Sequence, residues 1–332
     1  MKGIGLSRVA EAAGVSVATV SNTINRPHLV ATATRERVLQ TMQRLDFVPN
    51  RAAATLRSGS NKLLGVVVPE LVNPFYAAIT EAIAVAAGRR GYAVALCVSH
   101  DDAAVELSHF EMLAEQRAAG AIVVPYSASG PRLRQLRMVG THLVLVDRVV
   151  DQHDGCAVAV DDVAGGALAT RHLLSAGGEG LTLVNGPVSI PQCRDRRRGV
   201  LDTAADRSAV IEFTSPHMTV DEGVRIGREI ADSGAPRRVF CTNDQLALGV
   251  IRGLRDRGLR TPLDASVVGY GDLALAVEGD TSITTVAQPK AALGAEAVTK
   301  VLSEIDEGDA HRHSTMIFEP HLVVRESAPL GS

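Results

Sequence analysis

The sequence of 332 residues contains no tryptophan, and phenylalanine and tyrosine together bring the aromatic fraction to only 3%. A hydrophobic core must therefore be built mainly from Ala, Val and Leu. Hydrophobic residues still make up 46% of the chain and charged residues 21%, so the chain can bury a full core and is not intrinsically disordered. At about 150 residues per domain, the length predicts two to three folded units.

Long apolar segments are also missing. The chain has no run of about 18 uncharged apolar residues, so we expect no transmembrane helix and no membrane partner. The N-terminal segment MKGIGLSRVAEAAGVS lacks the apolar stretch of a signal peptide and carries charges at Arg8 and Glu11. These absences indicate a cytoplasmic protein.

Cysteine is scarce and dispersed. The four cysteines are Cys97, Cys156, Cys193 and Cys241, and no two of them form a CxxC motif. This spacing fits buried thiols in a reducing cytoplasm better than a disulfide framework or a zinc site.

The formal net charge of −3 conceals a split between the two ends of the chain. Residues 1–60 hold eight Lys and Arg against three Asp and Glu, a balance of +5. The remaining 272 residues hold 26 basic against 34 acidic side chains, a balance of −8. A small basic head on a larger acidic body is typical of a nucleic-acid-binding unit joined to another function. Chance variation in a solvated surface is the alternative.

The basic head has the pattern of three helices. Apolar residues recur at helical spacing over residues 6–13, and Gly14 can end that helix in the left-handed conformation. A second helix is predicted over residues 17–24, capped by Ser16, and a third begins within residues 32–34. Two short helices joined by a glycine-containing turn, followed by a third, form a helix-turn-helix. A helical bundle with no role in DNA binding is the alternative.

Two long segments, VAEAAGVSVATVSNTIN and TRERVLQTMQRLDFVPNRAAATL, resemble the DNA-binding head of the LacI/GalR (lac-repressor) family of bacterial transcription regulators. The resemblance extends to VVRES at residues 323–327 and covers nearly the whole chain. It implies an all-α helix-turn-helix domain over residues 1–48, a hinge helix and linker over 49–60, and an effector-binding and dimerisation domain over 61–332. It also implies a homodimer, or a higher oligomer, that represses transcription from a pseudo-palindromic operator.

The resemblance places residues 16–24 in the major groove of operator DNA as the recognition helix. There Asn22 is expected to read an adenine, and Val17 and Ala18 to contact a thymine methyl group. A merely solvent-exposed position is the alternative for Val17. The other residues of this helix that we expect to bind DNA are Ser16, Thr19, Ser21 and Asn25, and hydroxyl groups are suited to phosphate contacts.

Residues 49–60, PNRAAATLRSGS, connect the head to the body. Pro49 suits a helix start, but a helix this short is marginal alone in water. The resemblance implies that the segment folds on DNA and that Leu56 inserts into the minor groove, where it unstacks a base step. Arg51 is a second expected DNA contact of this segment. The alternative is that Leu56 packs on the body.

The acidic body alternates β-branched apolar runs with helical segments, which predicts doubly wound α/β structure. Strands are predicted at residues 64–68, 92–98, 121–124, 142–146, 181–184, 210–213, 239–241, 267–270, 317–318 and 322–324. Helices are predicted at residues 75–90, 103–119 and 290–305, among others. The pattern restarts after Asp161 and Asp162, which indicates two similar lobes. The resemblance assigns about 61–160 and 290–320 to lobe one and about 161–289 to lobe two, with about three crossings between them.

Such two-lobed folds resemble periplasmic sugar-binding proteins, which bind a small ligand between their lobes. The carboxyl ends of parallel strands gather loops and helix N-termini around such a crevice. The residues expected to bind an effector are Asn73, Phe75, Tyr126, Asp147, Arg148, Arg196, Asn243 and Asp272. Phe75 could equally belong to the core, and Asp244 could cap a helix or line the pocket. Gly271 stands where many relatives carry an acidic residue, so no particular sugar is expected.

The catalytic motifs GxGxxG, GxxxxGK[ST], HExxH and GxSxG are all missing, so we expect no enzyme and no cofactor. His311 and His313 form a pair without further nearby ligands, so no metal site is expected either. Two alternatives to a regulator stay open: a small-molecule carrier and a sugar-processing enzyme. The missing signal peptide and the basic head count against the carrier, and the missing catalytic constellation counts against the enzyme.

Overall fold

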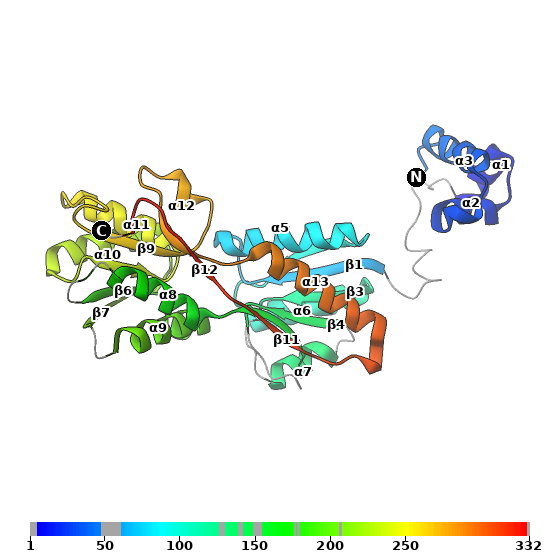
Figure 1. Ribbon diagram of the computed structural model, residues 1–332. Coiled ribbons are helices and arrows are strands. Elements are labelled where there is room, and N and C mark those ends of the chain that lie inside the picture. The colour runs from blue at the N-terminus through cyan, green and yellow to red at the C-terminus, as the bar shows by residue number, and fades with distance from the viewer. Residues whose placement is uncertain are drawn as a thin grey trace. The chain divides into compact units, whose positions relative to one another are not determined.

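The computed structural model describes residues 5–47, 61–125, 130–138, 142–148, 155–175, 177, 180–205 and 208–330. The chain divides between residues 61 and 62 into two compact units, a small head and a large body (Figure 1). No helix among the described residues is both long and apolar enough to cross a membrane. All four cysteines are buried free thiols, as expected.

The head contains the three helices that its sequence predicts. They are α1 (Leu6–Ala13), α2 (Val17–Asn25) and α3 (Thr32–Arg44), with a short 3-10 turn, η1 (Pro27–Leu29), before α3. Gly14 ends α1 with φ +65°, and the Ser16 hydroxyl caps α2 by accepting a hydrogen bond from the Thr19 amide at 3.1 Å. Val9, Val20 and Val38 form the centre of the head's core. The helix-turn-helix prediction is confirmed.

Lobe one of the body is a sheet in the order β11-β5-β4-β3-β1-β2, six strands within the described residues. The strands are β1 (Asn61–Val68), β2 (Ala93–Val98), β3 (Ala118–Val123), β4 (His142–Val146), β5 (Cys156–Val160) and β11 (Thr315–Phe318). The helices are α5 (Pro74–Arg89), α6 (Ala103–Glu115), α7 (Gly130–Met138) and α13 (Lys290–Glu307), and the 3-10 turn η3 (Gly308–Ala310) follows α13. Apolar side chains of α5 and α13 bury one face of the sheet, and those of α6 and α7 bury the other.

Lobe two repeats the design with the strand order β12-β10-β9-β8-β6-β7. The strands are β6 (Leu181–Asn185), β7 (Val210–Thr214), β8 (Arg238–Cys241), β9 (Ser266–Gly271), β10 (Thr284–Ala287) and β12 (His321–Val323), of which β12 runs antiparallel to β10. The helices are α8 (Asp162–Ser175), α9 (Pro191–Ala204), α10 (Val220–Ser233), α11 (Asp244–Asp256) and α12 (Leu275–Glu278). The two-lobed α/β prediction is therefore confirmed.

The chain crosses between the lobes three times, from β5 to α8, from β10 to α13, and from β11 to β12 (Figure 1). Because of the second crossing, α13 packs on the sheet of lobe one although most of lobe two precedes it in the sequence.

Two details of the predicted elements are wrong. The helix predicted over residues 103–119 ends at Glu115, because Arg117 adopts a positive φ of 52° and starts the turn into β3. Strands β5 and β10 were not predicted. In β10 the side chains of Thr284 and Thr285 are buried, and their hydroxyl groups are satisfied by Arg325 and Asp244. Such polar residues do not give the apolar signal of a buried strand.

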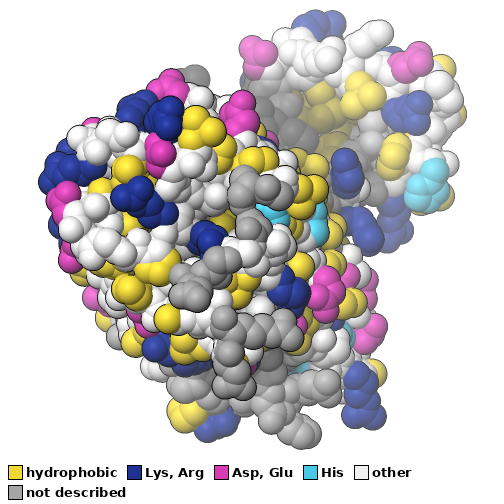
Figure 2. Space-filling view, turned by 60° about the vertical axis from the view of Figure 1, so that its left-hand side comes forward, with side chains coloured by type: hydrophobic (Ala, Val, Ile, Leu, Met, Phe, Trp, Pro, Cys, Tyr) yellow, Lys and Arg dark blue, Asp and Glu magenta, His cyan; other side chains and the backbone are white. Residues whose placement is uncertain are grey.

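The outer surface of lobe two carries basic and acidic side chains in pairs. Arg228 contacts Asp256 at 2.6 Å and Arg257 contacts Asp232 at 3.0 Å, and both pairs join α10 to the end of α11. Figure 2, in which this lobe faces the viewer, shows Lys and Arg interspersed with Asp and Glu. Exposed pairs of this kind contribute at most about 1 kcal/mol each. The apolar core must therefore supply most of the lobe's stability.

Helices α10 and α11 approach closely because glycines meet at their interface. A Cβ atom on Gly223 would lie 2.4 Å from the Leu246 carbonyl oxygen, and one on Gly249 would lie 2.1 Å from the Val220 carbonyl oxygen. Both distances are below any van der Waals contact, so the helix backbones would have to separate.

We expect Gly223→Ala to destabilise the body by about 1–3 kcal/mol, because the added methyl group overpacks the α10–α11 contact. Urea unfolding followed by circular dichroism measures the change. Gly88→Ala is the matched control: Gly88 also lies in a helix, but no heavy atom lies within 4 Å of its added Cβ. That variant should gain about 0.5–1 kcal/mol from helix propensity. Equal effects of the two substitutions would contradict the close-packing argument.

Candidate functional site

The exposed end of α2 carries the side chains that the sequence predicts to bind DNA. Ser16, Val17 and Ala18 are exposed, and Val17 has 44% of its surface accessible. Thr19, Ser21 and Asn22 are half-buried on the same helix, which Asn25 ends. The Oγ atoms of Ser16 and Thr19 lie 2.9 Å apart at the positive end of the helix dipole. The geometry suits contacts from this end of the helix to phosphates and base edges.

Three predicted site residues lie outside the described residues. They are Arg51 and Leu56, with the whole hinge segment 49–60, and Tyr126. Their roles stay predictions from the sequence.

A cavity of about 100 Å³ lies between the two lobes of the body, at the carboxyl ends of their parallel strands. It is lined by Pro69, Glu70, Asn73, Phe75, Tyr76, Asp101, Asp147, Ile190, Gln192, Cys193, Arg196, Met218, Asn243, Tyr270, Leu273 and Gln288. Small-molecule sites usually measure about 300–1,000 Å³. In this arrangement of the lobes the cavity is therefore smaller than a typical ligand site.

The first residues of α5 form part of the lobe-one side of the cavity. The Asn73 side chain caps this helix by accepting a hydrogen bond from the Phe75 amide at 3.1 Å. Phe75 packs edge-on against Tyr76, with ring centroids 5.6 Å apart, and belongs to the core as well as to the cavity. Burial raises the pKa of Tyr76, so its hydroxyl stays protonated and can donate a hydrogen bond.

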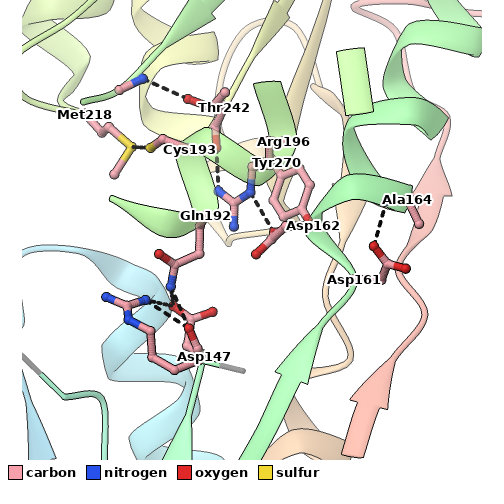
Figure 3. Close-up of polar contacts among 12 residues, drawn as sticks. Asp147, Asp161, Asp162, Ala164, Gln192, Cys193, Arg196, Met218, Thr242 and Tyr270 are labelled. Atoms are coloured by element: carbon pink, nitrogen blue, oxygen red, sulfur yellow. Dashed lines mark hydrogen bonds and ion pairs between the residues drawn. The ribbon is translucent and has the colours of Figure 1, made fainter. Parts of the chain in front are cut away.

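Asp147 closes the cavity at the end of β4. Its side chain is only 7% exposed, and its backbone has a positive φ of 63°. Gln192 of lobe two donates to its carboxylate and, at 2.8 Å, to its carbonyl oxygen, so this contact joins the two lobes (Figure 3). Burial raises the pKa of Asp147 to about 6, against the lowering effect of Arg148. Arg148 lies beside Asp147, 3.8 Å from its carboxylate, and does not line the cavity.

The lobe-two side of the cavity is organised around the buried guanidinium of Arg196. Its Nε donates to Asp162 at 2.8 Å and its Nη1 donates to the Thr242 carbonyl at 2.7 Å (Figure 3). The guanidinium carbon lies 3.6 Å from the centroid of the Tyr270 ring, and the Tyr270 hydroxyl donates to Asp162 at 2.7 Å. Burial alone lowers the pKa of Arg196, but the Asp162 carboxylate and the other acidic groups around the guanidinium together outweigh burial and raise the pKa, so the side chain stays charged.

Asn243 lines the cavity, and it caps α11 by accepting from the Leu246 amide at 2.8 Å. The Asp244 side chain does not cap this helix. It is fully buried, accepts from Thr285 at 2.6 Å, and does not line the cavity. Asp272 does not line the cavity either, because Arg325 holds its carboxylate at 2.6 Å.

Two buried polar atoms at the cavity have no hydrogen-bond partner among the described residues. They are the acceptor Oε1 of Gln192 and the donor Nε2 of Gln288. A buried polar atom without a partner costs about 1–3 kcal/mol, so a ligand that supplies one donor and one acceptor here would recover that cost.

The sequence prediction missed the roles of Gln192, Gln288 and Asp162 at the cavity. A signal existed for Gln192, because it follows Pro191 in the first turn of a helix, and helix starts gather around such a crevice. Asp162 reads correctly as a helix start, but its contacts with Arg196 and Tyr270 span 34 and 108 residues. No local pattern reports such contacts.

One expectation about the histidines is wrong. His311 and His313 do have further ligand neighbours, because the Sγ atom of Cys156 lies 3.2 Å from Nε2 of His311 and 3.7 Å from Nδ1 of His313. Glu304 completes the group. The sequence hid this cluster because Cys156 is more than 150 residues away from both histidines.

Two family models match the chain. The one described as "Bacterial regulatory proteins, lacI family" matches residues 6–50. The one described as "Periplasmic binding proteins and sugar binding domain of LacI family" matches residues 61–324. Between them they span the described head and nearly all of the body.

Curated relatives match over nearly their full length. The HTH-type transcriptional regulator MalR of Streptomyces coelicolor is 35% identical over 333 residues, which cover 97% of this chain and 96% of the relative. The HTH-type transcriptional repressor PurR of Aliivibrio fischeri is 30% identical over 327 residues, 96% of each chain.

Solved structures of similar proteins have the same fold. The lac repressor dimer bound to operator and the anti-inducer ONPF matches with a TM-score of 0.86 and 26% identity, over 99% of this chain and 100% of that one. A complex of the transcriptional regulator CelR with cellobiose matches with a TM-score of 0.70 and 29% identity, over 98% of this chain and 99% of that one.

The raised pKa of Asp147 predicts a pH-dependent loss of stability. An unfolded Asp has a pKa of about 3.9, so the folded body binds an extra proton between about pH 4 and pH 6. Its stability should therefore fall as the pH rises through that interval. Asp147→Asn should remove this fall and be about 1–3 kcal/mol more stable than the wild type above pH 6. Asn tolerates the positive φ at this position.

Urea unfolding at a series of pH values measures the effect of Asp147→Asn. Asp101→Asn is the matched control, because Asp101 lines the same cavity with a φ of 54° but is exposed. An Asp147→Asn profile that parallels the wild type across pH 4–7 would show that the carboxyl group is not the cause.

Proposed function

The chain belongs to the LacI family of bacterial regulatory proteins and is a sequence-specific DNA-binding transcriptional regulator, and from this premise we propose that an uncharged polyhydroxylated ligand controls its DNA binding. The ligand, a sugar or a similar metabolite, binds in the cleft between the two lobes. The unpaired Oε1 of Gln192 and Nε2 of Gln288 carry this proposal, because a hydroxyl group can donate to the first and accept from the second.

The charges around the cavity favour an uncharged ligand. Among its described lining residues, Glu70, Asp101 and Asp147 are acidic and Arg196 alone is basic. Asp162 already neutralises that arginine at 2.8 Å. Carboxylates accept hydrogen bonds from sugar hydroxyls but repel phosphate and carboxylate ligands. An effector of the phosphorylated-sugar class is therefore disfavoured.

The contact between Asp147 and Gln192 links ligand binding to the relative arrangement of the two lobes. This contact crosses the cleft, and a ligand larger than the 100 Å³ cavity must displace it. The lobes then adopt another relative arrangement, which the three crossings constrain. A difference of about 1–3 kcal/mol in ligand affinity between the two arrangements gives about 5–150-fold control of DNA binding.

The DNA side of the proposal follows from the head. A homodimer presents two α2 helices to a pseudo-palindromic operator, because two-fold protein symmetry matches two half-sites. Bound there, it acts as a repressor, as the curated PurR relatives do by name. The lac repressor dimer bound to operator is the solved example of this arrangement.

We propose that the protein has no enzymatic activity and acts in the cytoplasm, where its DNA target is. The thiol of Cys193 lines the cavity, but burial raises its pKa and it donates to the Met218 sulfur at 3.5 Å. A thiol in that state is a poor nucleophile.

The test of ligand control is a gel-shift titration on DNA from upstream of the protein's own gene, with a panel of neutral sugars, nucleosides and phosphorylated sugars. We expect specific binding at moderate salt and a 5–150-fold change with a neutral polyol. The absence of a shifted complex would contradict binding to this DNA. A response to phosphorylated sugars alone would contradict the proposed class of ligand.

Gln192→Ala should reduce the ligand response at least tenfold, because it removes both the unpaired acceptor at the cavity and the contact with Asp147 that the ligand displaces. Gln245→Ala is the matched control, since Gln245 is likewise the second residue of a lobe-two helix but does not line the cavity. Arg196→Ala is less informative, because it leaves Asp162 buried without its partner and destabilises the lobe by about 3–5 kcal/mol.

Asn22→Ala should cost about 1–3 kcal/mol at one base pair of each half-site if its amide reads an adenine. Binding to a set of single-base operator variants measures this effect. Ser21→Ala, the neighbouring residue predicted to contact phosphate, should instead weaken binding to all variants equally. A uniform loss for Asn22→Ala as well would show that Asn22 does not read a base.

A further inference from the structure

A cluster of four side chains lies at the edge of lobe one opposite the cleft. Cys156 is the first residue of β5, and Glu304 lies on the last turn of α13. His311 and His313 lie on the segment that leads from η3 to β11. One ligand atom of each side chain lies within 4.8 Å of those of the other three. The parallel strands of this lobe begin at this edge, so the cluster is separate from the cleft, which lies at their carboxyl ends.

The distances match a tetrahedral metal site. Zinc binds sulfur at about 2.3 Å and nitrogen at about 2.0–2.1 Å, so the sulfur and nitrogen ligands of one ion lie about 3.6 Å apart. Here Sγ of Cys156 lies 3.2 Å from Nε2 of His311 and 3.7 Å from Nδ1 of His313. These two sulfur–nitrogen separations are therefore close to those of a four-coordinate site.

His311 is already oriented as a metal ligand. Its Nδ1 lies 2.9 Å from the Oε2 atom of Glu307 and 3.4 Å from the Ser303 hydroxyl, while its Nε2 faces the sulfur of Cys156. In metal-binding histidines, the N–H group of the other ring nitrogen almost always donates a hydrogen bond to a carboxylate or another acceptor. This bond fixes the orientation and the tautomer of the ring. The side chain of His311 is only 7% exposed.

One carboxylate oxygen of Glu304 is buried without a hydrogen-bond partner in the described part of the chain, which is independent support for a bound cation. The residue is 5% exposed, and its Oε1 is paired with Arg137 at 3.1 Å. Its Oε2 is buried and has no hydrogen-bond partner among the described residues. A buried carboxylate oxygen left unsatisfied is costly, and a cation at the centre of the cluster would satisfy it.

We propose that Cys156, Glu304, His311 and His313 bind one divalent transition-metal ion, for which zinc is the best match. One thiolate, one carboxylate and two imidazoles form a ligand set that zinc accepts, whereas calcium and magnesium prefer oxygen ligands alone. On binding, the Cys156 thiol loses its proton to the solvent. The thiolate and the carboxylate then balance the two positive charges of the ion.

The bound ion joins three parts of lobe one. It ties the end of α13 and the segment after η3 to the start of β5, the strand from which the chain crosses to lobe two. A metal ion that binds only the folded state stabilises that state. The stabilisation grows with the logarithm of the ratio of the metal concentration to Kd. The ion therefore stabilises the lobe at the edge remote from the cleft, and it does so whether or not the ligand proposal holds.

The experiment titrates the full-length protein, first freed of metal with a chelator, with Co²⁺ and then with Zn²⁺. We expect one equivalent of Co²⁺ to give the intense near-ultraviolet band of a thiolate–cobalt bond and the visible bands of a tetrahedral site. Zn²⁺ should displace the cobalt and raise the thermal midpoint of unfolding. Cobalt binding without the thiolate band, or no binding beyond weak surface association, would overturn the proposal.

Substitutions test whether the ion binds at the cluster. Cys156→Ser should abolish the thiolate band. His313→Gln should weaken zinc binding at least tenfold, and because His313 is half-exposed, this substitution should leave the fold intact. Cys97→Ser is the matched control, because Cys97 is a buried free cysteine of the same sheet outside the cluster, and it should keep one equivalent with the full band. A band that survives in Cys156→Ser, or is lost in Cys97→Ser, would place the metal elsewhere.

Discussion

The buried guanidinium of Arg196 is the interaction on which the organisation of lobe two depends. It draws together Asp162 at the start of α8, the carbonyl that follows β8, and the ring of Tyr270 on β9. Gly165 and Gly166 allow α8 to lie this close to Tyr270 and to the backbone of α9. A Cβ on Gly165 would lie 2.5 Å from the Tyr270 hydroxyl, and one on Gly166 would lie 2.1 Å from the Arg196 carbonyl. One charge thus fixes the start of α8, where the chain first enters the lobe, and the lobe-two side of the cleft.

Local patterns predicted most elements but few of the contacts that make the sites. Ser16, Gly14 and the apolar spacing of the head act within a few residues, so the helix-turn-helix was readable from the sequence. The strand β10 was not, because its buried threonines find partners more than 40 residues away. His311 and His313 showed the same limit: their spacing is visible in the sequence, but the sulfur beside them belongs to Cys156, the first residue of β5, more than 150 residues earlier.

The two polar clusters of the body are built on different principles. At the cleft, Asp147 and Gln192 contact each other across separate lobes, so the contact changes whenever the lobes move. At the opposite edge, Cys156 and Glu304 both belong to lobe one, so their geometry does not depend on lobe arrangement. The contact at the cleft can therefore respond to ligand binding, whereas the cluster at the opposite edge can stabilise lobe one in any arrangement of the lobes.

The path of the chain sets the order in which the lobes can be completed during synthesis. Lobe one begins at β1, yet α13, which covers one face of its sheet, emerges from the ribosome only after β10 of lobe two. Domains generally fold as their residues emerge, so nearly all of lobe two is available to fold while lobe one still exposes an apolar face. The lobe that is made first is therefore finished late, and a nascent chain paused between residues 288 and 307 would present that uncovered face to chaperones.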